Sequence, residues 1–226
     1  MKKLLLISFV ILISQLLQGC VFIDDVGNGI FGSVSGSGRV ISERRTVGSF
    51  DRVSVLGSNN VSLVQGNEVS VDVNAYENLL PYLETYVEAG TLYVRYRPNT
   101  NVRNDNSLIR IRVPSLAGIS VSGSGNIITE TAFNFDRLEA VISGSGNISL
   151  FGTVRSLNCR ISGSGNLRAF DLLADEVTIA ISGSGSASVN ARNTLDATIS
   201  GSGEVVYQGN PAVNSRISGS GKVRRR

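Results

Sequence analysis

The chain has 226 residues, 17% of them charged, and contains 25 glycines but no histidine and no tryptophan. This length and composition suit one globular domain, and the missing histidine excludes a Ser-His or Cys-His nucleophile within the chain. The net charge of +3 is misleading, because Lys2, Lys3 and the cations of the last five residues leave a mildly acidic body. No basic face is expected, so nucleic acid is not expected as a partner.

The first 19 residues predict an export signal. Lys2 and Lys3 precede an apolar stretch over 4–17 that is short for a membrane-spanning helix. The stretch runs into LLQGC at 16–20, which resembles a bacterial lipobox, where the cysteine is lipidated. We expect 20–33 to be a lipidated linker whose Cys20 carries palmitate-type acyl chains. The alternative is ordinary secretion with Cys20 as an incidental thiol.

A lipid on Cys20 predicts a cell-envelope protein whose partner is the membrane. Val21 in place of an aspartate favours the outer membrane and leaves open which side the domain faces. Cys159 would then have no disulfide partner within the chain. It alternates with Leu157 and Ile161, so we expect a small buried hydrophobic residue there.

The segment 34–116 has irregular patterns. A hairpin is expected over 61–73, with Gly66-Asn67 at its turn. Leucines at helical spacing predict a short helix within 77–90, and alternation predicts strands over 91–97 and 107–113. This half also holds five tyrosines that form either a ligand platform or a local core: Tyr76, Tyr82, Tyr86, Tyr93 and Tyr96.

A four-residue motif, SGSG, recurs along the chain. Its seven copies begin at Ser35, Ser122, Ser143, Ser162, Ser182, Ser200 and Ser218. A degenerate copy lies at 55–61, where Asn59 replaces the second glycine. From Ser122 onward the starts are 18 to 21 residues apart, and the residues before each copy alternate between apolar and polar. This spacing fits either an antiparallel meander or a coil whose turns stack.

Equivalent positions of the copies keep one chemical type, which favours the stacked coil because strands one turn apart then lie in register. The columns are Ile142, Ile161, Ile181, Ile199 and Ile217 (with Val121 and Val55); Ile127, Ile148, Leu167, Ala187, Val205 and Val223; and Asn126, Asn147 and Asn166, continued by Ser186, Glu204 and Lys222. We expect an all-β fold, a right-handed parallel β-helix (β-solenoid) with 18–21-residue coils, regular over 117–226.

Continued alternation through ISGSGNI places the isoleucines and both glycines inward, and the serines and asparagine outward. Inward glycine permits a bend or close backbone approach. The outward side chains stack into ladders, and these form a candidate interaction surface: Ser124, Asn126, Ser145, Asn147, Ser164, Asn166, Ser184 and Ser186. Packing alone is the alternative explanation of the motif.

The chain resembles the head-GIN domain family of bacterial auto-transporter adhesins over most of 34–226. The resemblance rests on GSGRVISERRTVGSFDRVSVLGSNNVSLVQG, ENLLPYLETYVEAGTLYV, VPSLAGISVSGSGNI and the later ISGSGN copies, in that order. It implies a parallel β-helix-like fold on exported proteins, often lipoproteins of Bacteroidetes-type bacteria. It supplies no catalytic residues.

We expect a non-enzymatic envelope lipoprotein that binds glycan or another surface protein, because a solenoid offers flat sides and grooves. One alternative is a structural spacer or assembly unit. Another is a polysaccharide-active enzyme, with candidate groups Asp171, Asp175, Glu176, Arg155, Arg160 and Arg168. A solvated turn and outward arginines explain the same residues, so no catalytic residue, cofactor or metal is predicted.

The two ends of a solenoid are sheet edges, so self-association is a further expectation. The terminal KVRRR at 222–226 has three interpretations. It is a charged cap that blocks stacking, a contact to an anionic surface, or a solvated, frayed terminus.

Overall fold

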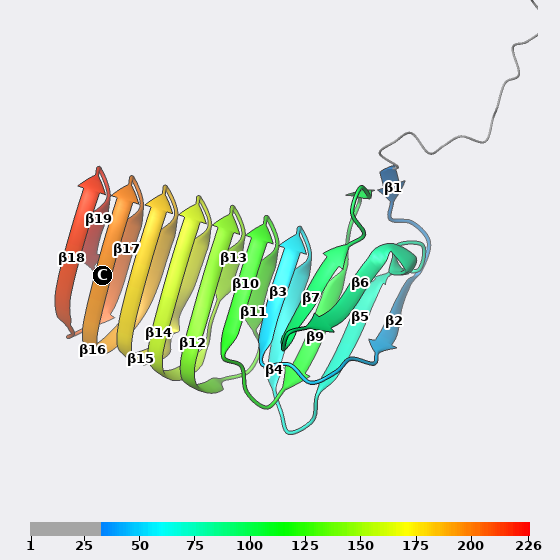
Figure 1. Cartoon of the computed structure of the whole chain (residues 1–226), viewed down its shortest axis with the longest axis horizontal. Helices are drawn as coiled ribbons and strands as arrows, with labels where there is room; N and C mark the ends of the chain where they lie inside the picture. Colours follow the sequence, from blue (N-terminus) through cyan, green and yellow to red (C-terminus); the bar gives the residue numbers. More distant parts are fainter. Residues whose placement is uncertain (1–32) are drawn as a thin grey trace, which may run out of the picture.

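The structure, a computed structural model, describes residues 33–226. The predicted export signal and the lipidated Cys20 lie outside the described residues. The described chain is all-β and forms a parallel β-solenoid, in which strands stack in layers along one long axis (Figure 1). The predicted fold class is confirmed.

Each layer contributes one strand to a front row, which faces the viewer in Figure 1, and one to a back row. The front row runs through β3 (Arg52–Gly57), β10 (Gly118–Gly123), the C-terminal parts of β12 (Phe133–Gly144), β14 (Gly152–Gly163), β15 (Asn166–Gly183) and β16 (Ser186–Gly201), and β18 (Ala212–Gly219). The back row runs through β4 (Asn60–Gln65), β11 (Asn126–Thr129), β13 (Asn147–Ser149), the N-terminal parts of β15 and β16, β17 (Glu204–Gly209) and β19 (Lys222–Arg225).

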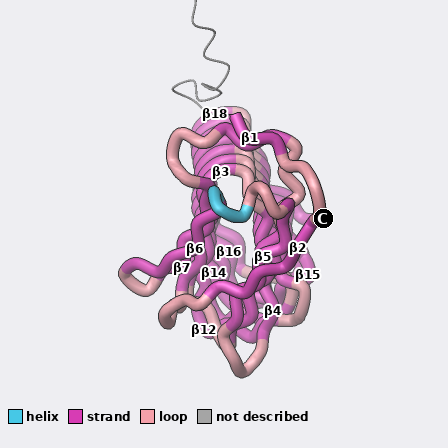
Figure 2. The backbone as a smooth tube through the Cα atoms, turned by 90° about the vertical axis from the view of Figure 1, so that its right-hand side faces the viewer, coloured by secondary structure: helices cyan, strands magenta, loops and turns pink. Residues whose placement is uncertain are grey.

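The layer made by β3 and β4 lies inside the stack although it comes first among the layers in the chain. The chain leaves it to form β5 (Ser70–Tyr76), the 3₁₀ helix η2 (Leu80–Tyr82), β6 (Leu83–Glu88), β7 (Thr91–Tyr96), β8 (Asn101–Arg103) and β9 (Leu108–Val113). Strands β7 and β9 pair in parallel with β3 and β4 on one side, and β10 and β11 pair with them on the other. Antiparallel β2 (Val40–Arg45), β5 and β6 close this end, which faces the viewer in Figure 2.

The predicted hairpin over 61–73 is wrong. Strands β4 and β5 do not pair with each other, because β9 lies between them, parallel to β4 and antiparallel to β5. The two edges of β4 are occupied by solenoid neighbours, β9 and β11, so the next segment of the chain has no free edge to join.

The predicted helix within 77–90 is also wrong. The segment contains only η2 and then β6, which pairs antiparallel with β7. Leu79, Leu80 and Leu83 are buried as their spacing suggested, but the following Thr-Tyr-Val run suits a strand. Tertiary pairing with β7 therefore overrides the helical pattern. The strands predicted over 91–97 and 107–113 are confirmed as β7 and β9.

The first SGSG copy, at Ser35, is not a solenoid layer. Strand β1 (Ser33–Ser35) pairs only with β8, in a separate two-stranded sheet. A Cβ on the buried Gly36 would lie 2.4 Å from the carbonyl oxygen of Asn104 and 2.5 Å from the Tyr76 ring. This copy therefore uses glycine for a close approach at the closed end, whereas the degenerate copy at 55–61 is a true layer.

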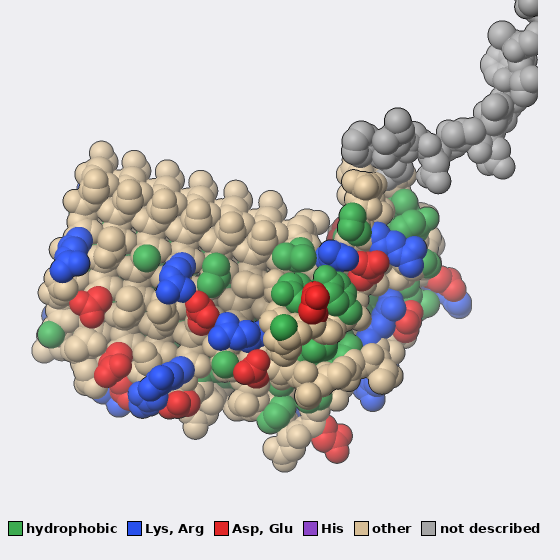
Figure 3. All heavy atoms as spheres, in the orientation of Figure 1, with side chains coloured by type: hydrophobic (Ala, Val, Ile, Leu, Met, Phe, Trp, Pro, Cys, Tyr) green, Lys and Arg blue, Asp and Glu red, His purple; other side chains and the backbone are tan. Residues whose placement is uncertain are grey.

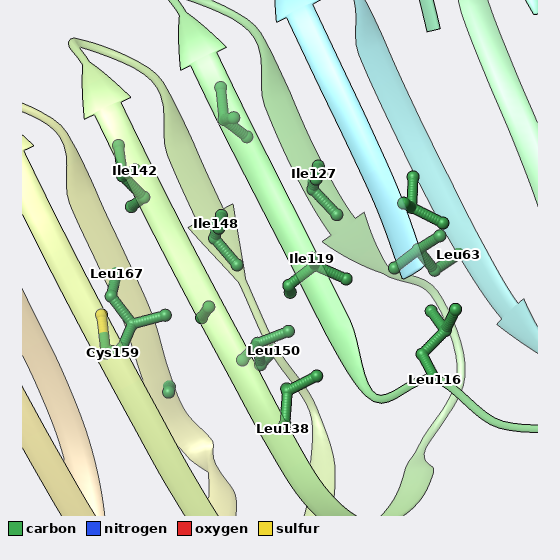
Figure 4. Packing of buried hydrophobic residues seen from close by; sticks show 14 of the residues in the cluster. Leu63, Leu116, Ile119, Ile127, Leu138, Ile142, Ile148, Leu150, Cys159 and Leu167 are labelled. Carbon is green, nitrogen blue, oxygen red and sulfur yellow. The ribbon is translucent and has the colours of Figure 1, made fainter. Parts of the chain in front are cut away.

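The predicted columns form part of the core in the regular layers, except that Ile217 in the final described layer is exposed. Val121 lies in register with Ile142, and the register continues through Ile161 to Ile217; Figure 4 shows some of the side chains packed between the rows. The Asn126 column is likewise in register, and it begins one layer earlier, at Asn60. Cys159 is fully buried, as predicted, and burial raises the pKa of its thiol to about 12.

Candidate functional site

The SGSG motif forms the turn between the front and back rows. In the repeat at Ser143, Gly144 has φ of +119°, and its predicted inward position is wrong, because it is half-exposed at the bend. Gly146 is buried, as predicted. The backbone N–H groups of Ser145 and Gly146 both donate to the carbonyl oxygen of Gly123, at 2.9 Å. The motif therefore closes the turn and joins it to the layer before.

The candidate ladder separates into two rows with different surroundings. Ser124, Ser145, Ser164 and Ser184 are exposed along the crest of turns, and the view in Figure 3 shows this crest without charged side chains. The asparagines instead bond to one another. The Nδ2 of Asn126 donates to Asn60, and Asn147 and Asn166 each donate to the asparagine one layer before, at 2.8 Å. The hydroxyl of Ser186 donates to Asn166 at 2.6 Å.

The hydroxyl groups of the exposed serines do not take part in the hydrogen bonds that join the asparagine row. Whether either row binds a ligand stays a prediction.

A different site lies on the outer face of the front row, which we call the tyrosine trough. It is a hollow of about 160 Å³ across β7, β3, β10 and β12. Its floor includes Ser54 and Ser120, whose hydroxyls are 2.9 Å apart, and its ends are Tyr93 and Val141. Ser54 is only 7% exposed. The trough therefore offers two fixed hydroxyls beside an aromatic ring.

Two charged side chains, Arg52 and Glu139, line the tyrosine trough, and Arg160 bonds to Glu139. Glu139 accepts from Arg52 at 2.9 Å and from Arg160 at 2.7 Å. Hydrogen bonding from Arg52, helped by Arg160, lowers the pKa of Glu139 below its usual value. The carboxylate therefore stays ionised and holds both guanidinium groups against the face, where each has further N–H donors for a ligand.

Tyr93, at one end of the trough, stacks on a second tyrosine ring. Tyr86 of β6 and Tyr93 of β7 lie 5.2 Å apart between centroids, and the Arg95 guanidinium covers Tyr86 at 5.1 Å. Tyr96, in contrast, packs against the core and bonds to Asp105, and burial raises its pKa. The tyrosines predicted as one group are thus divided, and the Tyr86–Tyr93 pair belongs to the outer face.

The same face continues into a second hollow of about 440 Å³ over β12 to β16. Its floor is formed by Ala180 and Thr198, small residues that follow Arg160 in the same outward column. Val141 lines both hollows. The two hollows therefore follow each other along the solenoid axis.

The residues considered for a polysaccharide-cleaving site are divided between two places on the surface. Arg155 pairs with Asp136 at 2.7 Å and Asp175 pairs with Arg192 at 2.9 Å. These pairs line one hollow of about 410 Å³, whereas Arg160 bonds to Glu139 and lines the hollow over Ala180. Asp171, Glu176 and Arg168 are exposed. Within 33–226, no three acidic, cysteine or histidine side chains are placed to share a metal ion.

The terminal cations are not frayed, contrary to one interpretation of KVRRR. Arg224 pairs with Glu204 at 2.7 Å. The backbone N–H of Arg226 donates to Tyr207, and its guanidinium lies over the Phe170 ring at 4.7 Å. Strand β19 is therefore the ordered final strand of the back row.

Sequence reasoning missed Arg52, Ser54, Ser120 and Glu139 as members of one site. They come from three layers, and Arg52 and Glu139 are 87 residues apart. The outward columns contain the signal, because Ser54, Ser120 and Val141 are in register, as are Arg52, Gly118 and Glu139. Finding it required extending the register from the copy at Ser122 back to the degenerate copy at 55–61.

Comparison with known proteins agrees with this architecture. The chain belongs to the family described as "Putative auto-transporter adhesin, head GIN domain", which it matches over residues 49–211. The family and the solenoid support a non-enzymatic surface interaction module, at the cell envelope or surface. A search of curated proteins found no match.

Solved structures of proteins from Bacteroides and Parabacteroides species share this fold. A "putative adhesin" from Bacteroides fragilis is 23% identical with a TM-score of 0.70. A "putative lipid binding protein" and a "putative adhesin" from Parabacteroides distasonis are 26% and 24% identical, with TM-scores of 0.59 and 0.55. Each alignment covers 85% of this chain and 99% of the other. Over 33–226, no helix is long and apolar enough to cross a membrane.

Proposed function

We propose that this protein is a lipid-anchored envelope module that binds glycan at the tyrosine trough. The observation that carries the proposal is the placement of Tyr93 beside the Ser54 and Ser120 hydroxyls, with Arg52 and Glu139 at the rim. Sugar rings present an apolar face and a rim of hydroxyls. An aromatic side chain with polar neighbours suits both.

The site is preorganised, which supports binding rather than a chance depression. The two serine hydroxyls are bonded to each other, and Arg52 is held by Glu139. Side chains that are already fixed lose little conformational freedom when a ligand binds. Val141 lines both this hollow and the larger one over Ala180, so an oligosaccharide that extends along the axis would meet both.

The experiment is a glycan array, with envelope polysaccharides in addition, probed with the mature chain. Saturable binding is expected, and Tyr93→Ala should weaken it by about tenfold or more. The matched control is Phe151→Ala, which removes an aromatic side chain that is 48% exposed and absent from the trough lining. Equal loss in both variants, or no saturable binding to any glycan, contradicts the proposal and favours the spacer alternative.

The anchor is tested separately. Mass spectrometry of the protein from membranes should show acyl chains on an N-terminal Cys20, and Cys20→Ser should release the protein in soluble form. A Cys159→Ser variant is the control, because Cys159 is buried in the core. Membrane retention of Cys20→Ser would contradict the lipid anchor without affecting the glycan proposal.

A further inference from the structure

Within residues 33–226, the layer made by β18 and β19 has an open edge. All of β18 is exposed, with Val213 at 41% and Ile217 at 44%, whereas their counterparts one layer inside, Leu195 and Ile199, are at 0% and 1%. Among residues 33–226, β18 pairs only with β16. An unpaired strand edge offers backbone N–H and C=O groups that another strand can join.

The side chains of this end are cationic. Residues 205–226 contain no aspartate or glutamate and include Arg216, Lys222, Arg224, Arg225 and Arg226. Arg224 is compensated by Glu204 of the layer before. Arg216 lies on β18 in the outward column and is in no ion pair within 33–226. The open edge therefore combines apolar inward side chains with unneutralised positive charge.

This charge disfavours a second copy of the same end as the occupant. A contact between two such ends would be symmetric and would bring the cations of both copies together. Like charges across an interface repel each other and select against that partner. The complementary partner is acidic.

We propose that this end binds an extended acidic segment of a partner protein, which adds to β18 as the next strand. Strand addition supplies main-chain hydrogen bonds, and alternate side chains give specificity. Apolar residues of the partner would cover Val213 and Ile217, and an acidic residue would meet Arg216. The layer before already places an acidic side chain against β18, because Asp196 accepts from Asn214 at 3.1 Å.

The test measures binding of a blocked eight-residue peptide of alternating valine and glutamate to the full chain in detergent, by fluorescence anisotropy. Saturable binding is expected, and added salt should weaken it. A peptide with four valines followed by four glutamates has the same charge but cannot place valine inward and glutamate outward. It should bind at least about tenfold more weakly.

Variants separate strand addition from bulk charge. Arg216→Glu should weaken binding of the alternating peptide by about tenfold, while Arg168→Glu, the same charge change at an exposed residue of β15, should leave it unchanged. Thermal unfolding of both variants checks that they fold. Equal binding of the two peptides, equal loss in the two variants, or no saturable binding would overturn the proposal. Dimerisation through β18 in sedimentation would overturn it in favour of a second copy.

Discussion

The Nδ2 of Asn147 donates to the Oδ1 of Asn126 at 2.8 Å, and Asn147 in turn accepts from Asn166 at the same distance. Each amide in this column thus acts as donor to one layer and acceptor for the next. Only a side chain with both functions can sit in the middle of such a ladder without leaving a partner unpaired.

Replacing Asn147 by aspartate should destabilise the fold by about 1–3 kcal/mol, because a carboxylate keeps the acceptor for Asn166 but removes the donor to Asn126. Urea denaturation measures the change. Asn147→Ser is the control, since Ser186 occupies the same column and donates to Asn166. Equal free energies of unfolding for the two variants would show that the donor to Asn126 does not stabilise the fold.

The turn glycines give a sharper test of the layer spacing. A Cβ on Gly144 would lie 2.6 Å from the carbonyl oxygen of Gly123, at a φ that L residues rarely adopt. Gly144→Ala should therefore cost about 2–4 kcal/mol in free energy of unfolding. Ser145→Ala, at the exposed neighbour, should change it by less than about 0.5 kcal/mol. Similar melting temperatures for both would contradict the packed turn.

Acid should weaken the fold partly through Glu139. Its pKa is lower in the folded chain than in the unfolded chain, so its contribution is present above the unfolded pKa and is lost as pH falls through the folded pKa. Glu139→Gln should remove about 0.5 kcal/mol at neutral pH, since the side chain is about one-third exposed, and should flatten the decline in stability on the acid side. Glu88→Gln, which removes one carboxylate at another exposed residue, is the control, and the pH dependence of unfolding is measured for both variants. Unchanged pH dependence in Glu139→Gln would contradict this role.

Cys159 reports on the integrity of the core. Its thiol is fully buried and its pKa is raised to about 12, so a thiol reagent at pH 8 should not modify it in the folded protein. In a Cys20→Ser chain, labelling should rise along with unfolding in urea. Rapid labelling without denaturant would show that the layers around β14 open locally.

Removing the last three residues tests the charged-cap interpretation. Deletion of Arg224 to Arg226 removes two cations that are held against β17 and β15 and uncovers part of the β17 edge. We expect increased self-association in sedimentation. Replacing all three arginines by glutamine keeps the strand but removes the charge. This variant therefore separates the effect of the charge from that of the uncovered β17 edge. Unchanged sedimentation of both variants would exclude a capping role.

The regular layers were predictable because register makes equivalent positions contact each other. The isoleucine columns could therefore be read from spacing alone, and Val55 could be added from the degenerate copy at 55–61. The closed end could not be read in this way, since local patterns do not reveal that β9 inserts between β4 and β5. The trough was missed for the same reason, because Tyr93 reaches Ser54 only through the pairing of β7 with β3.

The interior position of the β3–β4 layer has a consequence for the order of folding. Its neighbours on both sides are encoded later, by β7 and β9 and then by β10 and β11. A chain that is synthesised N-terminus first must hold β3 and β4 without solenoid neighbours until these segments emerge. Closure of those long loops is a slow step, whereas each layer from β12 onward adds to a template that already exists. The rate-limiting step of folding is therefore expected in the first half of the chain. The later layers should then add one after another in chain order.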